Sequence, residues 1–276
     1  MAYELPEWVA ELTDPRRART TEELADRLVP LAEQAIDISR RLQAQLTELN
    51  APFETEALQA LVDVLHTRSA QAFGEVNGEI ENTGQDRVAR ILKRADAAPA
   101  GQRAELRERL AAEVFPALKA QQRVVCERIG DRTADAVQAA AKTLLDRTGE
   151  LAAAVTDMVH QVLPAAQEGL TLAGRVSALT GRVRKAGRGD IPGDLRREAA
   201  EVAGSCEETL GRLEMEWSMI GARASTVRAA LRAVEETAFS EVTQAMAHCV
   251  AELAPAHVKV LNDTEDLAIA LLTEGS

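Results

Sequence analysis

A run of apolar residues spaced alternately three and four apart extends over residues 195–253 and constrains the fold more than any other feature. Such spacing places one apolar stripe along an α-helix, and a stripe sustained over many heptads is typical of long helices that pack side by side in coiled coils. We therefore expect one long helix here, ended by Pro255. Its stripe consists of Leu195, Ala199, Val202, Cys206, Leu210, Leu213, Trp217, Ile220, Ala224, Val227, Leu231 and Val234, continued by Val242, Met246 and Leu253.

Shorter patterns of the same kind predict the other helices. A capping box, Thr20-Thr-Glu-Glu23, opens a helix that continues to Asn50. Further helices are expected over about 53–96, with a break at Asn82-Thr-Gly84, and over 102–129. A further helix is expected from about 131 toward 186, and Gly130 leaves open whether it is separate from the helix at 102–129. The predicted fold class is all-α: an elongated up-and-down helical bundle with long coiled-coil-like helices. We expect a short N-terminal leader at 1–19 and a single helical-bundle domain at 20–276, with a hairpin turn near 187–193.

The composition agrees with packed helices. Aromatic residues make up 3% of the chain while hydrophobic residues make up 46%, so the core must be built from Ala, Leu and Val. This balance excludes a β-sandwich or a propeller, and the abundance of Leu and Val excludes a disordered chain. The net charge of −12 argues against a nucleic-acid-binding protein.

Several features predict a cytoplasmic protein. The N-terminal Met-Ala-Tyr-Glu-Leu-Pro-Glu-Trp carries two acids and no apolar core, so we expect no secretory signal peptide. The longest stretches free of Asp, Glu, Lys and Arg, residues 158–167 and 242–251, are too short for a transmembrane helix. The three cysteines Cys126, Cys206 and Cys249 are odd in number and far apart, which favours reduced core thiols.

The sequence offers little catalytic chemistry. Asp63 with His66, and Asp157 with His160, have the i, i+3 spacing of ligands in di-metal helical bundles. Aspartate reaches poorly into such a site, and His160 lies off the apolar stripe. The chain has no phosphate-binding Gly-Lys loop. We therefore predict no catalytic residues, no metal site, no cofactor and no small-molecule substrate, and hence no enzyme.

Basic residues gather around two of the predicted loops. Residues 86–110 hold seven basic and four acidic side chains, and residues 175–197 hold seven basic and two acidic ones. If the helices run up and down, both loops fall at one end of the bundle. That end would bind an anionic partner or lipid headgroups, although arginines solvated near helix ends would give the same pattern. The candidate residues for this anion- or partner-binding tip are Arg90, Lys93, Arg94, Arg103, Arg182, Arg184, Lys185 and Arg188.

The main functional hypothesis is a non-enzymatic helical-bundle scaffold or interaction protein. It would bind a protein partner, or self-assemble, through its coiled-coil surfaces. Met215, Trp217 and Met219 form a candidate interface on the long helix, although a single Trp in a helical stripe is more often a core residue.

A membrane-active protein is the alternative hypothesis. Segment 151–181 carries only Asp157, Glu168 and Arg175 as charged residues. With its long helices and this low-charge segment, the chain resembles the α-helical pore-forming toxins in architecture. That resemblance implies insertion through 151–181, and a protein that binds anionic membranes only peripherally through the basic tip fits equally well.

Overall fold

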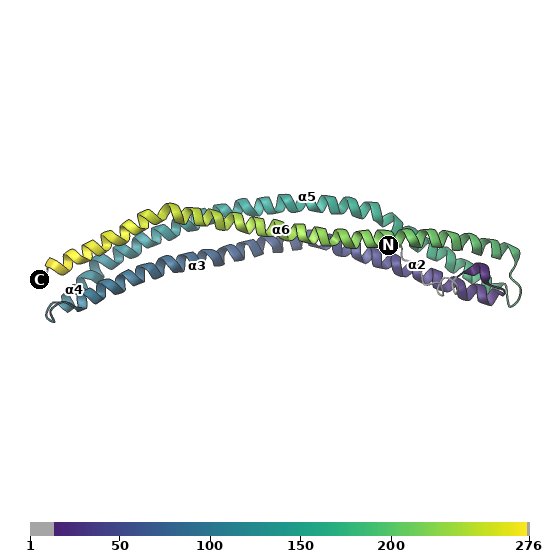
Figure 1. Cartoon of the computed structure of the whole chain (residues 1–276), viewed down its shortest axis with the longest axis horizontal. Coiled ribbons are helices and arrows are strands. Elements are labelled where there is room, and N and C mark those ends of the chain that lie inside the picture. The colour runs from purple at the N-terminus through teal and green to yellow at the C-terminus, as the bar shows by residue number, and fades with distance from the viewer. Residues whose placement is uncertain (1–13, 275–276) are drawn as a thin grey trace. The chain divides into compact units, whose positions relative to one another are not determined.

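The computed structural model describes residues 14–274 and confirms an all-α bundle (Figure 1). Helix accounts for 93% of the described residues, 14–274, and this range contains no strand. Residues 1–13 of the predicted leader lie outside the described part. The elements are η1 (Pro15–Arg17), α2 (Thr21–Asn50), η2 (Ala51–Phe53), α3 (Thr55–Asp96), α4 (Arg103–Arg109), the π-helix η3 (Leu110–Val114), α5 (Phe115–Lys185) and α6 (Gly193–Glu274).

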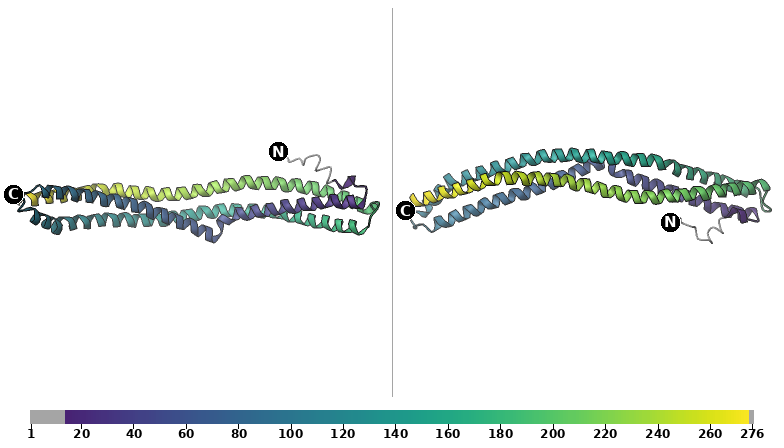
Figure 2. Two further views of the ribbon diagram at one scale, coloured as in Figure 1. Left: turned by 90° about the horizontal axis from the view of Figure 1, so that it is seen from below. Right: turned by 45° about the horizontal axis from the view of Figure 1, so that its top comes forward.

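The chain divides into two compact units. Unit 1 combines the chain up to Ala57 with Thr148–Leu231, and unit 2 combines Leu58–Arg147 with the chain from Arg232 onward. Within unit 1, α2 lies beside the C-terminal part of α5 and the N-terminal part of α6. Within unit 2, α3 lies beside the remaining parts of α5 and α6 (Figure 2). The single domain expected over 20–276 stays a prediction.

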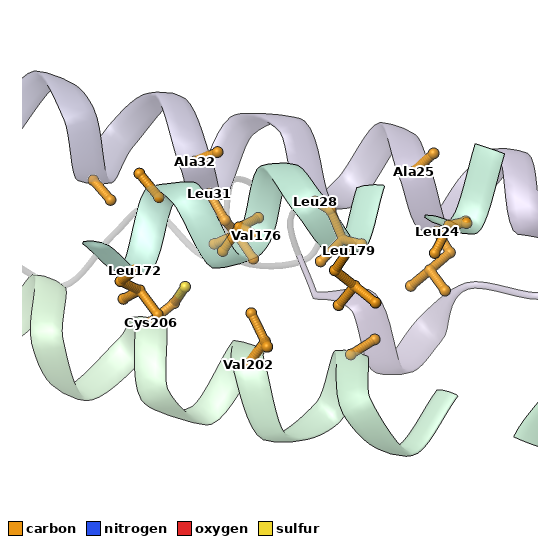
Figure 3. Close-up of a cluster of buried hydrophobic side chains, with 14 of the residues drawn as sticks. Leu24, Ala25, Leu28, Leu31, Ala32, Leu172, Val176, Leu179, Val202 and Cys206 are labelled. Atoms are coloured by element: carbon orange, nitrogen blue, oxygen red, sulfur yellow. The ribbon is translucent and has the colours of Figure 1, made fainter. Parts of the chain in front are cut away.

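The core of unit 1 shows that neighbouring helices alternate in direction. Leu28 of α2 shares a buried cluster with Val176 of α5 and Val202 of α6 (Figure 3). Farther along α2, Leu42 packs with residues earlier in α5 and later in α6, including Val162 and Leu213. Because residue numbers rise along α2 and α6 while they fall along α5, this unit has the predicted up-and-down topology.

The predicted capping box and hairpin turn both form in unit 1. The Thr20 hydroxyl accepts a hydrogen bond from the backbone N–H of Glu23, and the Glu23 carboxylate accepts one from the backbone N–H of Arg19 at 2.7 Å. The turn between α5 and α6 contains Gly187, whose φ of +84° lies in the left-handed region. Its carbonyl accepts a 2.6 Å hydrogen bond from the Thr21 hydroxyl, which fastens the turn to the start of α2.

Unit 2 repeats this arrangement with α3 in place of α2. Leu65 of α3 packs with Leu144 of α5 and Val242 of α6, whereas Ile91 of α3 packs with Val114 and Leu271. Residue numbers again rise along α3 and α6 while they fall along the α5 side. The core of unit 2 therefore also has up-and-down topology.

Two predicted helix ends are wrong. Helix α3 continues through Asn82-Thr-Gly84. Gly84 is buried there, and the side chain of Gln122 from α5 packs directly against it, so the glycine serves close helix packing and does not break the helix. Helix α6 continues through Pro255 to Glu274. Both Pro255 and Ala251, whose carbonyl loses its i+4 donor, are exposed, so solvent can satisfy that carbonyl. Gly130, at which the sequence left open whether one helix ends and another begins, lies inside the continuous helix α5.

Candidate functional site

The candidate interface residues lie on α6 in unit 1 and are exposed. Met215 is 56% exposed, Trp217 39% and Met219 38%. Met215 and Met219 are four residues apart and so share one face of the helix. The core side of the same turns is formed by Leu213 and Ile220, both buried. These methionines therefore occupy the side of α6 that faces away from the core of unit 1.

Trp217 belongs to the predicted stripe yet lies at its edge. Its neighbours in the stripe, Leu213 and Ile220, are at most 1% exposed. Glu214 lies on the flank of the core, and burial raises the pKa of its carboxyl. Trp217 is therefore exposed and does not occupy an inward core position. Large exposed apolar side chains gathered on one short segment are typical of interaction surfaces.

Most of the predicted basic residues in unit 2 already have partners. Arg94 forms a 2.9 Å ion pair with Glu265 of α6. Arg103 donates a 2.6 Å hydrogen bond to the carbonyl of Ala98, and Arg90 donates one to the carbonyl of Asp86 at 3.4 Å. Lys93, the fourth predicted basic residue of this unit, makes no ion pair or hydrogen bond with a described residue.

Of the four predicted tip residues in unit 1, two are paired and two are free. Arg182 forms a 2.6 Å ion pair with Glu198, and Arg188 forms a 2.7 Å pair with Glu22. Arg184 and Lys185, in the last turn of α5, have no such partner within residues 14–274. They are exposed and free to bind an anion.

The two basic groups belong to different units. Arg90, Lys93, Arg94 and Arg103 are in unit 2, whereas Arg182, Arg184, Lys185 and Arg188 are in unit 1. Neither unit by itself contains both groups. A single basic tip made from all eight residues therefore stays a prediction.

The histidine pairs do not form a site in the described structure. His66 and His160 are both exposed, and Asp63 accepts a 2.9 Å hydrogen bond from Gln59. Within residues 14–274, no group of three or more His, Cys, Asp or Glu side chains has the geometry to hold a metal ion.

Segment 151–181 lies within α5 and supplies core residues to unit 1. Val155, Ala166 and Val176 are fully buried against α2 and α6. None of the described helices combines the length and apolar character needed to cross a membrane. Insertion of this segment would require unit 1 to open.

One feature was missed by reasoning from the sequence: a groove of about 950 Å³ between α3 and α5 in unit 2. A signal for it exists, because Asn77, Glu81, Gln85, Val88 and Leu92 recur at helical spacing. The helix break expected at residues 82–84 separated Asn77 and Glu81 from Gln85, Val88 and Leu92, so the sequence did not show that these residues share one face of a single helix. Helix α3 buries only five of its 42 residues, compared with eleven of 30 in α2, so it keeps a face available beside α5.

No protein-family model matches the sequence, and no curated protein matches it.

Proposed function

We propose that this protein is a non-enzymatic helical scaffold that binds a protein partner, or a second copy of itself, through the outer surface of α6. The observation that supports this proposal is the exposure of Met215, Trp217 and Met219 within five residues of a long helix. Methionine side chains are flexible and polarizable, and Trp contributes a large contact area. Burying such side chains against a partner helix would be favourable.

The test compares a charged and an apolar replacement of the same two side chains. Immobilised full-length protein, the double variant Met215→Glu/Met219→Glu and the matched control Met215→Leu/Met219→Leu are each exposed to an extract of the source cells. The proposal predicts that the wild type and the Leu variant retain the same discrete proteins, which include the chain itself if it self-assembles. The Glu variant should lose them while keeping its helical circular dichroism spectrum. Equal retention by all three forms would contradict it.

A second candidate function, peripheral binding to anionic membranes, is supported by the unpaired cations Arg184 and Lys185 at the end of α5. Full-length protein should then co-sediment with vesicles containing phosphatidylserine at low salt and dissociate at high salt. Arg184→Glu/Lys185→Glu should abolish this binding without affecting the retention of protein partners. Release of a dye trapped inside the vesicles would in addition support insertion of segment 151–181 into the membrane.

A further inference from the structure

The groove between α3 and α5 has the size of a small-molecule site. Its volume of about 950 Å³ lies at the upper end of the 300–1,000 Å³ range usual for ligand pockets. Both walls belong to unit 2. The α3 wall runs from Asn77 to Leu92, and the α5 wall runs from Phe115 to Cys126.

The groove changes in character along its length. Helix α3 and the adjoining part of α5 run in opposite directions, so the end of one wall meets the beginning of the other. One end is therefore lined by Val88, Leu92, Phe115 and Pro116, which are apolar. The other end is lined by Asn77, Glu81, Gln122, Arg123 and Cys126, which are polar. A ligand that matches this lining has an apolar part and a polar head.

The charges of the lining favour an anionic head. Lys119 is exposed, lies in the middle of the α5 wall and makes no ion pair with a described residue. Arg123 lies four residues farther along the same face, 76% exposed, with only a 3.4 Å contact to Glu127. Glu81 is the one acid among the lining residues, so this groove has a positive balance in a chain of net charge −12.

The polar end also holds an unused hydrogen-bond acceptor, which marks this end as polar but makes no contact with a carboxylate, itself an acceptor. The side-chain oxygen of Asn77 is buried and has no hydrogen-bond partner among the described residues. Unsatisfied buried polar groups are rare and unfavourable in folded proteins. Cys126 lies at this same end, where burial and, to a lesser degree, Glu81 raise the pKa of its thiol. Its position makes it a reporter for occupation of the groove.

We propose that this groove binds a single-chain anionic amphiphile of the fatty-acid class, with its alkyl chain along Val88, Leu92 and Phe115 and its carboxylate toward Lys119 and Arg123. This site is independent of the proposed function, because its residues belong to unit 2 whereas Met215 and Met219 belong to unit 1. A helix of a partner protein is the other occupant that a groove between two helices can accept, and the experiment separates the two.

The experiment measures protection of Cys126 by sodium laurate, kept below the concentration at which it forms micelles. Full-length protein is alkylated with iodoacetamide, and peptide mass spectrometry follows each cysteine separately. Cys206 and Cys249 are core residues and act as internal references. We expect laurate to slow alkylation of Cys126 severalfold and saturably, with one laurate bound per chain in equilibrium dialysis. Dodecylammonium, with the same number of carbon atoms and the opposite charge, should protect Cys126 much less.

Matched charge reversals test the predicted headgroup contact. Lys119→Glu should weaken laurate binding at least about tenfold, because it removes one charge-assisted contact and places a second anion beside the carboxylate. Lys142→Glu makes the same charge change at another exposed position of α5 outside the groove and should leave binding unchanged. Ala89→Trp should block the groove, with the circular dichroism spectrum confirming that the variant folds. Unchanged Cys126 alkylation in laurate, or equal effects of the two lysine substitutions, would overturn the proposal and leave the groove to a partner helix.

Discussion

Gln122 of α5 lies over Gly84 of α3, and its side-chain amide donates a 2.8 Å hydrogen bond to the carbonyl of Ile80. A Cβ atom at residue 84 would overlap that amide. Gly84 therefore allows the close approach of two helices in unit 2, which explains why the chain keeps a glycine inside a continuous helix.

This contact predicts that the effect of Gly84→Ala depends on residue 122. Alanine favours a helix over glycine by about 1 kcal/mol, but displacing the Gln122 amide from its bond costs about 1–3 kcal/mol. Gly84→Ala should lower the free energy of unfolding by about 1 kcal/mol in the wild type. In a Gln122→Ala background the same substitution should raise it by about 1 kcal/mol. Urea denaturation of the four proteins measures this double-mutant cycle, and additive effects would show that the two residues do not compete for space.

Gly169 of α5 predicts a similar effect in unit 1. A Cβ atom here would overlap the Ser39 hydroxyl and lie 2.7 Å from a methyl carbon of Leu213, and both of these side chains are fully buried. Gly169→Ala should therefore destabilise the protein by about 1–3 kcal/mol through overpacking. Gly174, five residues along the same helix, is exposed and has open space at its Cβ position. Gly174→Ala should stabilise by up to about 1 kcal/mol. Thermal or urea denaturation that ranked the two variants in the opposite order would contradict the described packing.

Glu265 of α6 joins two arginines of α3. It contacts Arg87 and Arg94 and is only 16% exposed, while Arg87 also donates a 3.3 Å hydrogen bond to Asn262. Removing this carboxylate leaves partly buried Arg87 without its anion, so Glu265→Ala should cost about 1–3 kcal/mol. Glu127→Ala, which breaks the exposed Arg123–Glu127 pair, should cost less than about 1 kcal/mol. Urea denaturation at low and high salt compares the two variants. Equal costs would mean that burial adds nothing to the Glu265 contacts.

His257 of α6 predicts a loss of stability in acid. Both of its ring nitrogens are buried without a hydrogen-bond partner among the described residues, and burial lowers its pKa from the ordinary value of 6.5. Below pH 6.5 the unfolded chain therefore binds a proton more readily than the folded one, and the free energy of unfolding falls. His257→Leu should lose less stability than the wild type between pH 8 and pH 5. His160→Gln, at an exposed position, should behave like the wild type. Identical pH profiles for wild type and His257→Leu would contradict this assignment.

Local patterns predicted the parts of the fold that depend on sequence-near contacts. The capping box at Thr20 and the apolar spacing that follows it gave the start and end of α2 to within one residue. The turn around Gly187 follows from the need for a left-handed residue after α5. The stripe from Leu195 to Ala224 predicted the buried face of α6 in unit 1, with Trp217 at its edge as the exception. The next two stripe residues, Val227 and Leu231, are only partly buried.

Contacts between distant residues could not be predicted in this way. Gly84 resembled a helix breaker because the side chain that fills the space beside it, Gln122, is far away in sequence. Arg94 and Arg182 resembled free cations because their partners, Glu265 and Glu198, lie on α6. The groove in unit 2 was hidden for the same reason, since its two walls come from α3 and α5.

The most direct test of the proposed scaffold function is photo-crosslinking of the native chain with photo-methionine in place of methionine. Met215 and Met219 are exposed on α6, whereas Met246 is buried in the core of unit 2 and serves as the internal control. The account predicts that Met215 and Met219 form crosslinks to another polypeptide, either a partner or a second copy, while Met246 crosslinks only within its own chain. Crosslinking of Met215 and Met219 to solvent or to their own chain alone would contradict it.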